Sequence, residues 1–220
     1  MKIALLHTVN ATVLSLVPRI KQKLPDKTLL NFMDDSILTS LLAKEAGLEY
    51  CFEKMLCYCQ FARRQGADVI MNCCSSMGAF SDWAKAKGFP QPVIRIDEPM
   101  ADAALKKGKR IAVLATVETS LQPPIDMLLK KRPDCHAEAI LVKGAAALNM
   151  SGKKAEHDAV IAKAAERIYN DFDAIMLSQG SMEDAVQFVV GKKDKILTSP
   201  ALAIAHLAAV CATGRLSDDR

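Results

Sequence analysis

Short apolar stretches alternate with longer amphipathic segments along the whole chain. Each short stretch ends in polar or small residues, as in Lys2–Leu6 followed by His7-Thr8. The expected strands are residues 2–6, 28–33, 68–71, 93–96, 110–114, 136–142, 174–177 and 195–197. The segments between them, such as Ile37–Gln65, have helical spacing of apolar residues. Short apolar strands separated by helices are typical of an α/β fold with a parallel sheet.

The second half of the chain repeats the pattern of the first. Residues 2–9 aligned with 110–117 give five identities in eight positions, and residues 68–77 aligned with 173–182 give five in ten. The offsets of 108 and 105 positions are nearly equal, which indicates duplication. We therefore expect two pseudo-symmetric parallel-sheet α/β halves with the site in the cleft between them.

The boundary between the halves is expected where Pro99 interrupts the chain. The segment after Pro200 is expected to form a helix that packs back on the first half. The predicted domains are residues 1–98 plus 201–220, and residues 99–200.

Composition narrows the classes of partner. The 29 basic and 25 acidic residues give a net charge of +4, and no basic stripe is interleaved with aromatic residues, so a nucleic-acid partner is not expected. The apolar run Ile3–Leu6 is too short for a signal peptide, and the longest apolar stretch, residues 201–212, is too short to span a membrane. Seven cysteines without a secretory signal favour a reducing compartment, so the expected location is the cytoplasm.

Two adjacent cysteines, Cys73 and Cys74, follow the third expected strand. Ligands of parallel sheets bind at the carboxyl ends of the strands, and a helix start there would lower a thiol's pKa. Because neighbouring side chains point to opposite sides, one thiol should face the core and the other a ligand, as base or nucleophile. The alternatives are that both fill a small buried space, or that they form a redox sensor. The remaining cysteines, at positions 51, 57, 59, 135 and 211, have no comparable setting.

Hydroxyl groups and a histidine stand at the same edge of the predicted sheets. Thr116 and Thr119 follow the strand 110–114 and would either bind a carboxylate or cap a helix. His7 ends the first strand, where it would either face the ligand or serve a structural role.

The stretch Asp68–Ser76, which reads DVIMNCCSS, resembles the first cysteine loop of the aspartate/glutamate/hydantoin racemase superfamily. On this match Cys74 takes the place of the first catalytic cysteine, and Ser75 and Ser76 take that of a carboxylate-binding pair. Residues 96–100 and 112–119 are similar to further family segments, with Thr116 and Thr119 at substrate-binding positions, and Asp34 and Ser36 match a weaker feature. The resemblance implies two pseudo-symmetric domains, no cofactor, and proton transfer at a carbon next to a carboxylate by two opposed cysteines.

The second cysteine loop of that superfamily is altered in this chain. Leu177–Met182 resembles it, but Gln179 stands in the cysteine's place, and the internal repeat also pairs Cys74 with Gln179. An amide cannot transfer a proton at neutral pH, whereas it can hydrogen-bond a carboxylate or an enolate oxygen. Two-thiol racemisation is therefore not expected.

The predicted function is that of a cofactor-independent, racemase-like isomerase for a small acid or amino acid, with Cys74 as its single thiol. Ser181 is expected to join Ser75, Ser76, Thr116, Thr119 and His7 in substrate binding. The alternatives are a decarboxylase or lyase on the same fold, and a protein that binds a small carboxylate without catalysis. The expected partner is a small-molecule carboxylate, with no membrane partner, and the sequence leaves a homo-oligomer open.

Overall fold

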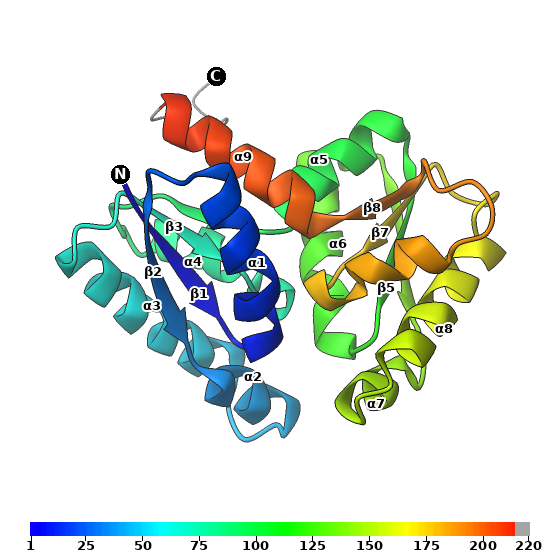
Figure 1. Cartoon of the computed structure of the whole chain (residues 1–220), viewed down its shortest axis with the longest axis horizontal. Helices are drawn as coiled ribbons and strands as arrows, with labels where there is room; N and C mark the ends of the chain where they lie inside the picture. The colour runs from blue at the N-terminus through cyan, green and yellow to red at the C-terminus, as the bar shows by residue number, and fades with distance from the viewer. Residues whose placement is uncertain (214–220) are drawn as a thin grey trace. The chain divides into compact units, whose positions relative to one another are not determined.

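The computed structural model describes residues 1–213. The chain divides into two compact units (Figure 1). The first unit comprises Met1–Ile96 and residues 203–213, and the second comprises Asp97–Leu202. Each unit contains a four-stranded parallel sheet, so the predicted fold class of two parallel-sheet α/β halves is confirmed.

The sheet of the first unit has the strand order β2-β1-β3-β4. Its strands are β1 (Lys2–His7), β2 (Thr28–Met33), β3 (Val69–Asn72) and β4 (Val93–Arg95). Its helices are α1 (Asn10–Lys23), α2 (Asp35–Leu42), α3 (Leu48–Arg64), the 3₁₀ turn η1 (Ser75–Met77), α4 (Phe80–Ala86) and the greater part of α9 (Ser199–Thr213).

The sheet of the second unit repeats this topology with the order β6-β5-β7-β8. Its strands are β5 (Arg110–Ala115), β6 (His136–Leu141), β7 (Ala174–Leu177) and β8 (Ile196–Thr198). Its helices are α5 (Glu98–Lys107), the 3₁₀ turn η2 (Glu118–Ser120), α6 (Gln122–Lys131), α7 (Ala145–Met150), α8 (Lys154–Arg167) and the 3₁₀ segment η3 (Gly180–Phe188).

The predicted internal repeat is confirmed at the level of strand register. Ile3 of β1 is paired with Val69 of β3, and Ile111 of β5 is paired with Ala174 of β7. All eight expected strands are present with ends that differ by at most one residue. The sequence identities between residues 2–9 and 110–117, and between residues 68–77 and 173–182, therefore identified the equivalent strands correctly.

The expected helical segment 37–65 is divided in the structure. Helix α2 ends at Leu42 and α3 begins at Leu48. Between them Lys44 has a φ of 58°, the left-handed conformation that a continuous helix cannot contain. Two helices therefore replace the single long one that the apolar spacing suggested.

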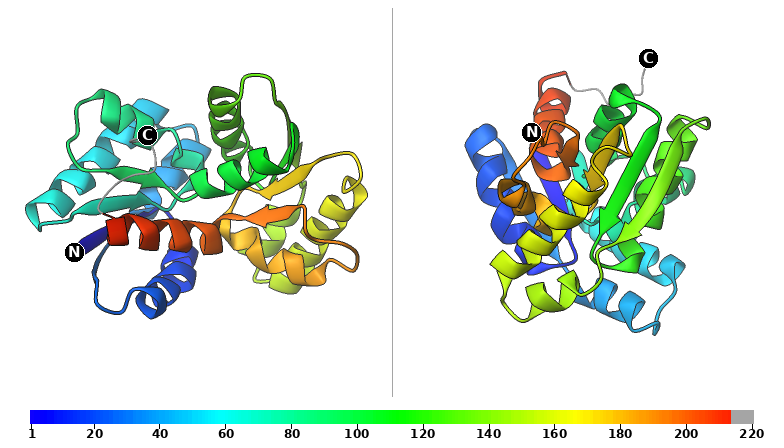
Figure 2. Two further views of the ribbon diagram at one scale, coloured as in Figure 1. Left: turned by 90° about the horizontal axis from the view of Figure 1, so that it is seen from above. Right: turned by 90° about the vertical axis from the view of Figure 1, so that its right-hand side faces the viewer.

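Alternate residues of the central strands face two separate cores. In the first unit Ile3 and Leu5 pack toward α1 and α9, whereas Ala4 and Leu6 pack toward α3 and α4. Helix α9 contributes the buried side chains of Ala203, Ile204, Leu207 and Val210 to the first of these cores. Burying each large aliphatic side chain contributes about 1.5–3 kcal/mol to folding. Figure 2 shows the strands of each unit flanked by their helices.

Across residues 1–213, no helix is long and apolar enough to cross a bilayer.

Candidate active site

The two adjacent cysteines point to opposite faces of the first sheet. Cys73 packs with residues of α1 and α9, and its Sγ donates to the carbonyl of Met71 at 3.6 Å. Complete burial raises the pKa of Cys73 far above its ordinary value. Cys74 packs instead on the α3 and α4 face. The two thiols therefore point to opposite faces, as the alternation predicted, and each lies in a buried hydrophobic cluster, with Cys73 4% and Cys74 8% exposed.

The loop after β3 is held by a buried amide. Asn72, the last residue of β3, accepts a hydrogen bond from the backbone N–H of Cys74 at 3.1 Å and donates from Nδ2 to the carbonyl of Met77 at 2.7 Å. The side chain therefore ties together the two ends of η1. Asn72 is not among the site residues predicted from the sequence, although a polar residue at the end of an apolar strand indicates a role in the following loop.

The helix start expected directly after Cys74 is a single 3₁₀ turn. Cys74 is the N-terminal flanking residue of η1, and the α-helix α4 begins only at Phe80. Such a short turn has little dipole to offer an anion, so the expected effect of a helix N-terminus on the thiol is not available here. Ser75 and Ser76 lie within this turn and are buried.

His7 ends β1 as a neutral, buried imidazole. Thr12 donates its hydroxyl hydrogen to the carbonyl of Val9 at 2.8 Å, so it accepts the hydrogen bond from Nδ1 of His7 at 2.9 Å. This arrangement places the ring proton on Nδ1. Nε2 has no partner with full hydrogen-bond geometry in the described chain, although the Asn31 side chain lies close enough to the ring to oppose the lowering of its pKa. Burial is the dominant influence on the imidazole and lowers the pKa of His7 to about 4.

The His7 and Cys74 side chains lie on opposite faces of the first sheet. The His7 ring contacts Thr12 of α1, on the face that Cys73 shares, while the side chain of Cys74 lies on the other face. Thr8 follows His7 directly, is buried, and has a hydroxyl with no partner among residues 1–213. The sequence analysis missed Thr8, which is the second polar residue after the apolar run of β1.

In the second unit, Gln179 occupies the position equivalent to Cys74. Cys74 is the second residue after β3 and immediately precedes η1, and Gln179 is the second residue after β7 and immediately precedes η3. This equivalence agrees with the pairing of the two residues in the repeated sequence.

Thr116 fixes the orientation of the Gln179 amide. The backbone N–H of Thr116 donates to Oε1 of Gln179 at 2.6 Å, and the Thr116 hydroxyl donates to the same oxygen at 2.9 Å. A backbone N–H can only donate, so the atom facing it must be the carbonyl oxygen of the amide. The half-buried Gln179 therefore presents its Nε2 group, a donor, away from Thr116.

The hydroxyl groups that follow the strands of the second unit differ in their surroundings. The residue that precedes η2 is Val117, and no side chain caps this turn, so Thr116 does not serve as the helix cap that was the alternative reading. Thr119 and Ser181 are half-buried in η2 and at the start of η3. Ser178 is buried with a hydroxyl that has no partner within the described residues.

A cluster of titratable side chains surrounds buried His157 and Asp158 on α8, and it was not predicted from the sequence. Nδ1 of His157 is 2.8 Å from a carboxylate oxygen of Asp158, and both residues are almost fully buried. Lys154 contacts Asp158 at 2.6 Å and Asp184 of η3 at 3.1 Å, so the cluster joins α8 to η3. Its sequence signal, a His-Asp pair at the start of an amphipathic helix, was visible but had no motif around it.

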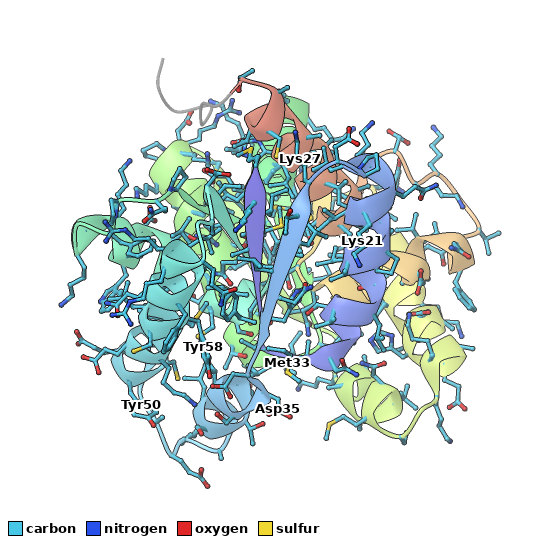
Figure 3. All side chains as sticks on the ribbon, turned by 60° about the vertical axis from the view of Figure 1, so that its left-hand side comes forward. Lys21, Lys27, Met33, Asp35, Tyr50 and Tyr58 are labelled. Carbon is cyan, nitrogen blue, oxygen red and sulfur yellow. The ribbon has the colours of Figure 1, made fainter. Side chains whose placement is uncertain are left out.

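Asp34 and Ser36, the weaker match to the family pattern, form the cap of α2. The Asp34 carboxylate accepts from the backbone N–H of Ser36 at 3.0 Å and from the Tyr58 hydroxyl at 2.8 Å, and it pairs with Lys54 at 2.8 Å. Burial by itself would raise the pKa of Asp34, but the hydrogen bonds from Lys54, Ser36 and Tyr58 outweigh it and lower the pKa to about 2. Figure 3 shows Tyr58 on α3 near Met33, the last residue of β2.

The fold and the two loops define a duplicated α/β protein whose polar loops follow the third strand of each sheet. A thiol stands in one loop and an oriented amide in the other. The family model described as Asp/Glu/Hydantoin racemase matches residues 8–207, and the chain belongs to this family. It is a racemase-like member of the family, as the sequence resemblance indicated.

Solved structures share the fold at low sequence identity. A glutamate racemase of Bacillus anthracis is 18% identical with a TM-score of 0.75, covering 98% of this chain and 84% of the racemase. An allantoin racemase of Klebsiella pneumoniae is 17% identical with a TM-score of 0.69, covering 99% and 90% of the two chains. A variant of arylmalonate decarboxylase with associated sulfate is 17% identical with a TM-score of 0.60, covering 98% and 95%. No curated protein gives a significant sequence match.

Proposed function

We propose that this protein is a cofactor-independent enzyme that acts at the carbon next to the carboxylate of a small acid or amino acid, with Cys74 as its single acid-base thiol. The observation that carries this proposal is the Gln179 amide, which stands at the position equivalent to Cys74 and is oriented by two hydrogen bonds from Thr116. A thiol exchanges protons at physiological pH, whereas an amide only donates and accepts hydrogen bonds.

The two loops would serve the same substrate with different chemistry. The Cys74 thiolate would remove the proton from the α-carbon to give an enolate and the thiol. Return of this proton to the same face of the α-carbon regenerates the substrate, and its delivery on that face to another carbon of the delocalised anion gives an isomer. Nε2 of Gln179 would donate a hydrogen bond to the enolate oxygen that develops during the reaction, where a preoriented donor is most effective. Thr116 would then act through Gln179, since both of its donors point to Oε1.

The carboxylate of the substrate would be held by hydroxyl and backbone groups. Ser75 and Ser76 stand beside Cys74 in the first unit, and Thr119 and Ser181 stand in the loops of the second unit. His7, which carries no charge near neutral pH, would contribute the lone pair of Nε2 as an acceptor for a substrate N–H or O–H. This proposal takes the protein as two domains that carry these groups. The first consists of residues 1–98 and 201–220, and the second of residues 99–200.

A decarboxylase or lyase is the second candidate, and the oriented amide also favours it. Loss of CO₂ breaks one C–C bond and leaves its electron pair on the α-carbon as an enolate, which needs one proton from one acid. The Cys74 thiol would supply that proton, and Gln179 would stabilise the enolate. This chemistry requires no acid on the opposite face.

The test is incubation with a panel of amino acids, hydroxy acids and malonates in heavy water. Mass spectrometry and NMR then measure deuterium at the α-carbon and loss of CO₂. Deuterium uptake with retention of configuration supports acid-base chemistry by a single thiol, and CO₂ release with one deuterium incorporated supports the decarboxylase. Ligand-induced thermal stabilisation without either reaction identifies a carboxylate-binding protein and contradicts both.

Two variants make the test specific. Cys74→Ala should abolish the reaction, because the only acid-base thiol of the loop is lost. Cys73→Ala, the matched control at the neighbouring position, should leave it within about a few-fold of the native rate, because that thiol is buried in the opposite core. Retained activity in Cys74→Ala would contradict the proposal.

A further inference from the structure

The ends of the third and fourth strands differ between the two units. The last paired residues of β3 and β4 are Asn72 and Arg95, whereas the equivalent residues of β7 and β8 are Leu177 and Thr198. A cation therefore stands beside the loop that carries the thiol, and an uncharged residue stands beside the loop that carries the amide. This difference between Arg95 and Thr198 matches the difference between the two loops. A neighbouring cation stabilises the ionised form of a thiol, whereas an amide has no ionised form at neutral pH.

Arg95 is buried against the thiol loop. The side chain is 6% exposed, and a Cβ atom placed on Gly78 would lie 2.3 Å from its Nη2 and 2.8 Å from its Cζ. Gly78 has helical torsions, φ −53° and ψ −43°, which every residue adopts readily. The guanidinium therefore packs directly on the end of the turn that Cys74 begins, and a side chain at position 78 would have to displace it and would also lie 3.1 Å from the Ser75 carbonyl oxygen.

The loop itself has little freedom to move away from this cation. Asn72 ties the Cys74 N–H to the carbonyl of Met77, and the N–H of Gly78 donates to the carbonyl of Ser75 at 3.0 Å. Both ends of the turn are thus fixed, and Gly78 at its C-terminal end lies next to the Arg95 guanidinium. A guanidinium keeps its charge in proteins, and burial strengthens its effect on a nearby anion because screening by water is reduced.

We propose that Arg95 is a positioning residue that favours the thiolate form of Cys74. The inference rests on the proposed function, because it takes Cys74 as the reactive group. The Arg95 charge would lower the pKa of Cys74, as a helix N-terminus was expected to do and as the short turn η1 does not.

The other titratable groups around this part of the sheet do not supply the same cation. From α3, burial raises the pKa of Cys51 and raises that of Cys59 to about 12, so both thiols are neutral. Lys54 is paired with Asp34 at 2.8 Å, which offsets its charge. The remaining groups are His7 on β1, Cys73 after β3, Tyr58 on α3, exposed Asp82 on α4 and buried Asp97 after β4. Asp82 and Asp97 are acidic and would oppose a thiolate.

The experiment measures the rate of Cys74 alkylation by iodoacetamide from pH 5 to pH 10, with peptide mass spectrometry to separate Cys74 from the other thiols. The midpoint of the rate profile gives the pKa of the thiol. In Arg95→Met the midpoint should rise by about one unit, the lower end of the effect of a close opposite charge. The high-pH plateau should not fall, because a more basic thiolate is at least as nucleophilic.

Three further variants separate charge from packing. Arg95→Lys keeps a cation, so its midpoint should lie closer to that of the native protein than to that of Arg95→Met. Gly78→Ala keeps the charge but inserts a methyl group where the guanidinium packs, so its midpoint should rise in the same direction. Arg63→Met removes one exposed positive charge from α3 and should leave the midpoint unchanged.

An unchanged midpoint in folded Arg95→Met overturns the inference, as does an equal shift in Arg63→Met. Circular dichroism and thermal unfolding show whether each variant is folded. If Arg95→Met does not fold, an unchanged midpoint in Gly78→Ala overturns the inference instead. The readout needs no substrate, so an Arg95-dependent thiol in a protein that transforms no carboxylate would contradict the proposed function and leave this inference standing.

Discussion

Thr116 donates two hydrogen bonds to one oxygen of Gln179, from its backbone N–H at 2.6 Å and from its hydroxyl at 2.9 Å. The two residues follow adjacent strands, β5 and β7, and are 63 positions apart in the chain. The amide is therefore held in one orientation with its NH₂ group available. The second loop thus carries a fixed hydrogen-bond donor at the position equivalent to Cys74 in the repeat.

Gln179→Cys should introduce racemisation of a substrate whose α-proton the native enzyme already exchanges. The new thiol adds an acid at the position equivalent to Cys74, although its pKa would depend on neighbours adapted to an amide, so the gain is expected to be modest. Chiral chromatography of the product measures it. The double variant with Cys74→Ala should lose both exchange and racemisation. Racemisation by the native protein at an ordinary enzymatic rate, roughly 1–10³ per second, would contradict the single-thiol mechanism.

Thr116→Val should weaken the reaction without changing the reactivity of Cys74. Valine has nearly the same shape and keeps the backbone N–H, so Gln179 loses one of its two hydrogen bonds and about 1 kcal/mol of stabilisation. We expect the rate of α-proton exchange to fall about tenfold, as for a weakened donor to a developing oxyanion. Thr116→Ser restores the hydroxyl and is the matched control. Equal rates in the valine and native proteins would show that the hydroxyl does not position the amide.

Limited alkylation should distinguish the adjacent thiols. With substoichiometric iodoacetamide near pH 6, Cys74 is expected to react before Cys73, whose pKa burial raises and whose Sγ donates to Met71. Exposed Cys57 serves as an internal reference for an accessible thiol. Peptide mass spectrometry gives the order, and labelling of Cys73 ahead of Cys74 would reverse the assignment.

His7 should make the protein less stable as the pH falls from about 6.5 to about 4. In the folded protein its pKa is lowered to about 4 by burial, so only the unfolded chain binds a proton in this range. Above pH 6.5 both states are neutral and His7 has no effect on the pH dependence. Over the whole window the loss is about 3 kcal/mol, from a difference of about 2.5 pKa units.

The measurement is the free energy of unfolding by urea at pH 7, 6, 5 and 4. His7→Asn keeps an amide hydrogen near the Nδ1 position and does not titrate, so its stability should change less across this range than that of the native protein. Parallel pH profiles for the two proteins would show that the His7 imidazole titrates normally.

Asp158→Ala should destabilise the second unit strongly. The substitution leaves the ring N–H of buried His157 without its acceptor and Lys154 without one of its two acidic partners. Breaking a buried pair by removing one partner costs about 3–5 kcal/mol. Asp184→Asn changes the exposed partner of Lys154 and should cost less than about 1 kcal/mol. Chemical unfolding compares the two, and similar small losses would show that the buried cluster contributes little.

Much of the fold could be predicted because each strand is a short apolar run, and equivalent strands of the two halves have similar sequences. The run from Lys2 to Leu6 and that from Arg110 to Leu114 alternate toward two cores, and their similarity identified the repeat. The position of Gln179 opposite Cys74 in the repeat also needed only the sequence. The break between α2 and α3 did not, because helical spacing continues through residues 43–47 while Lys44 adopts a left-handed torsion.

The sequence alone determined the fold class, the family resemblance and the pair of residues on which the proposed chemistry depends, since each follows from short apolar runs and motifs of neighbouring residues. Only the tertiary structure decided what surrounds that pair. Thr116 and Gln179 are joined because their strands are neighbours, and Arg95 reaches Gly78 because β4 lies beside β3. These contacts join residues far apart in the chain. No local pattern specifies them, because they form only when strand pairing and side-chain packing bring the residues within hydrogen-bonding or van der Waals distance.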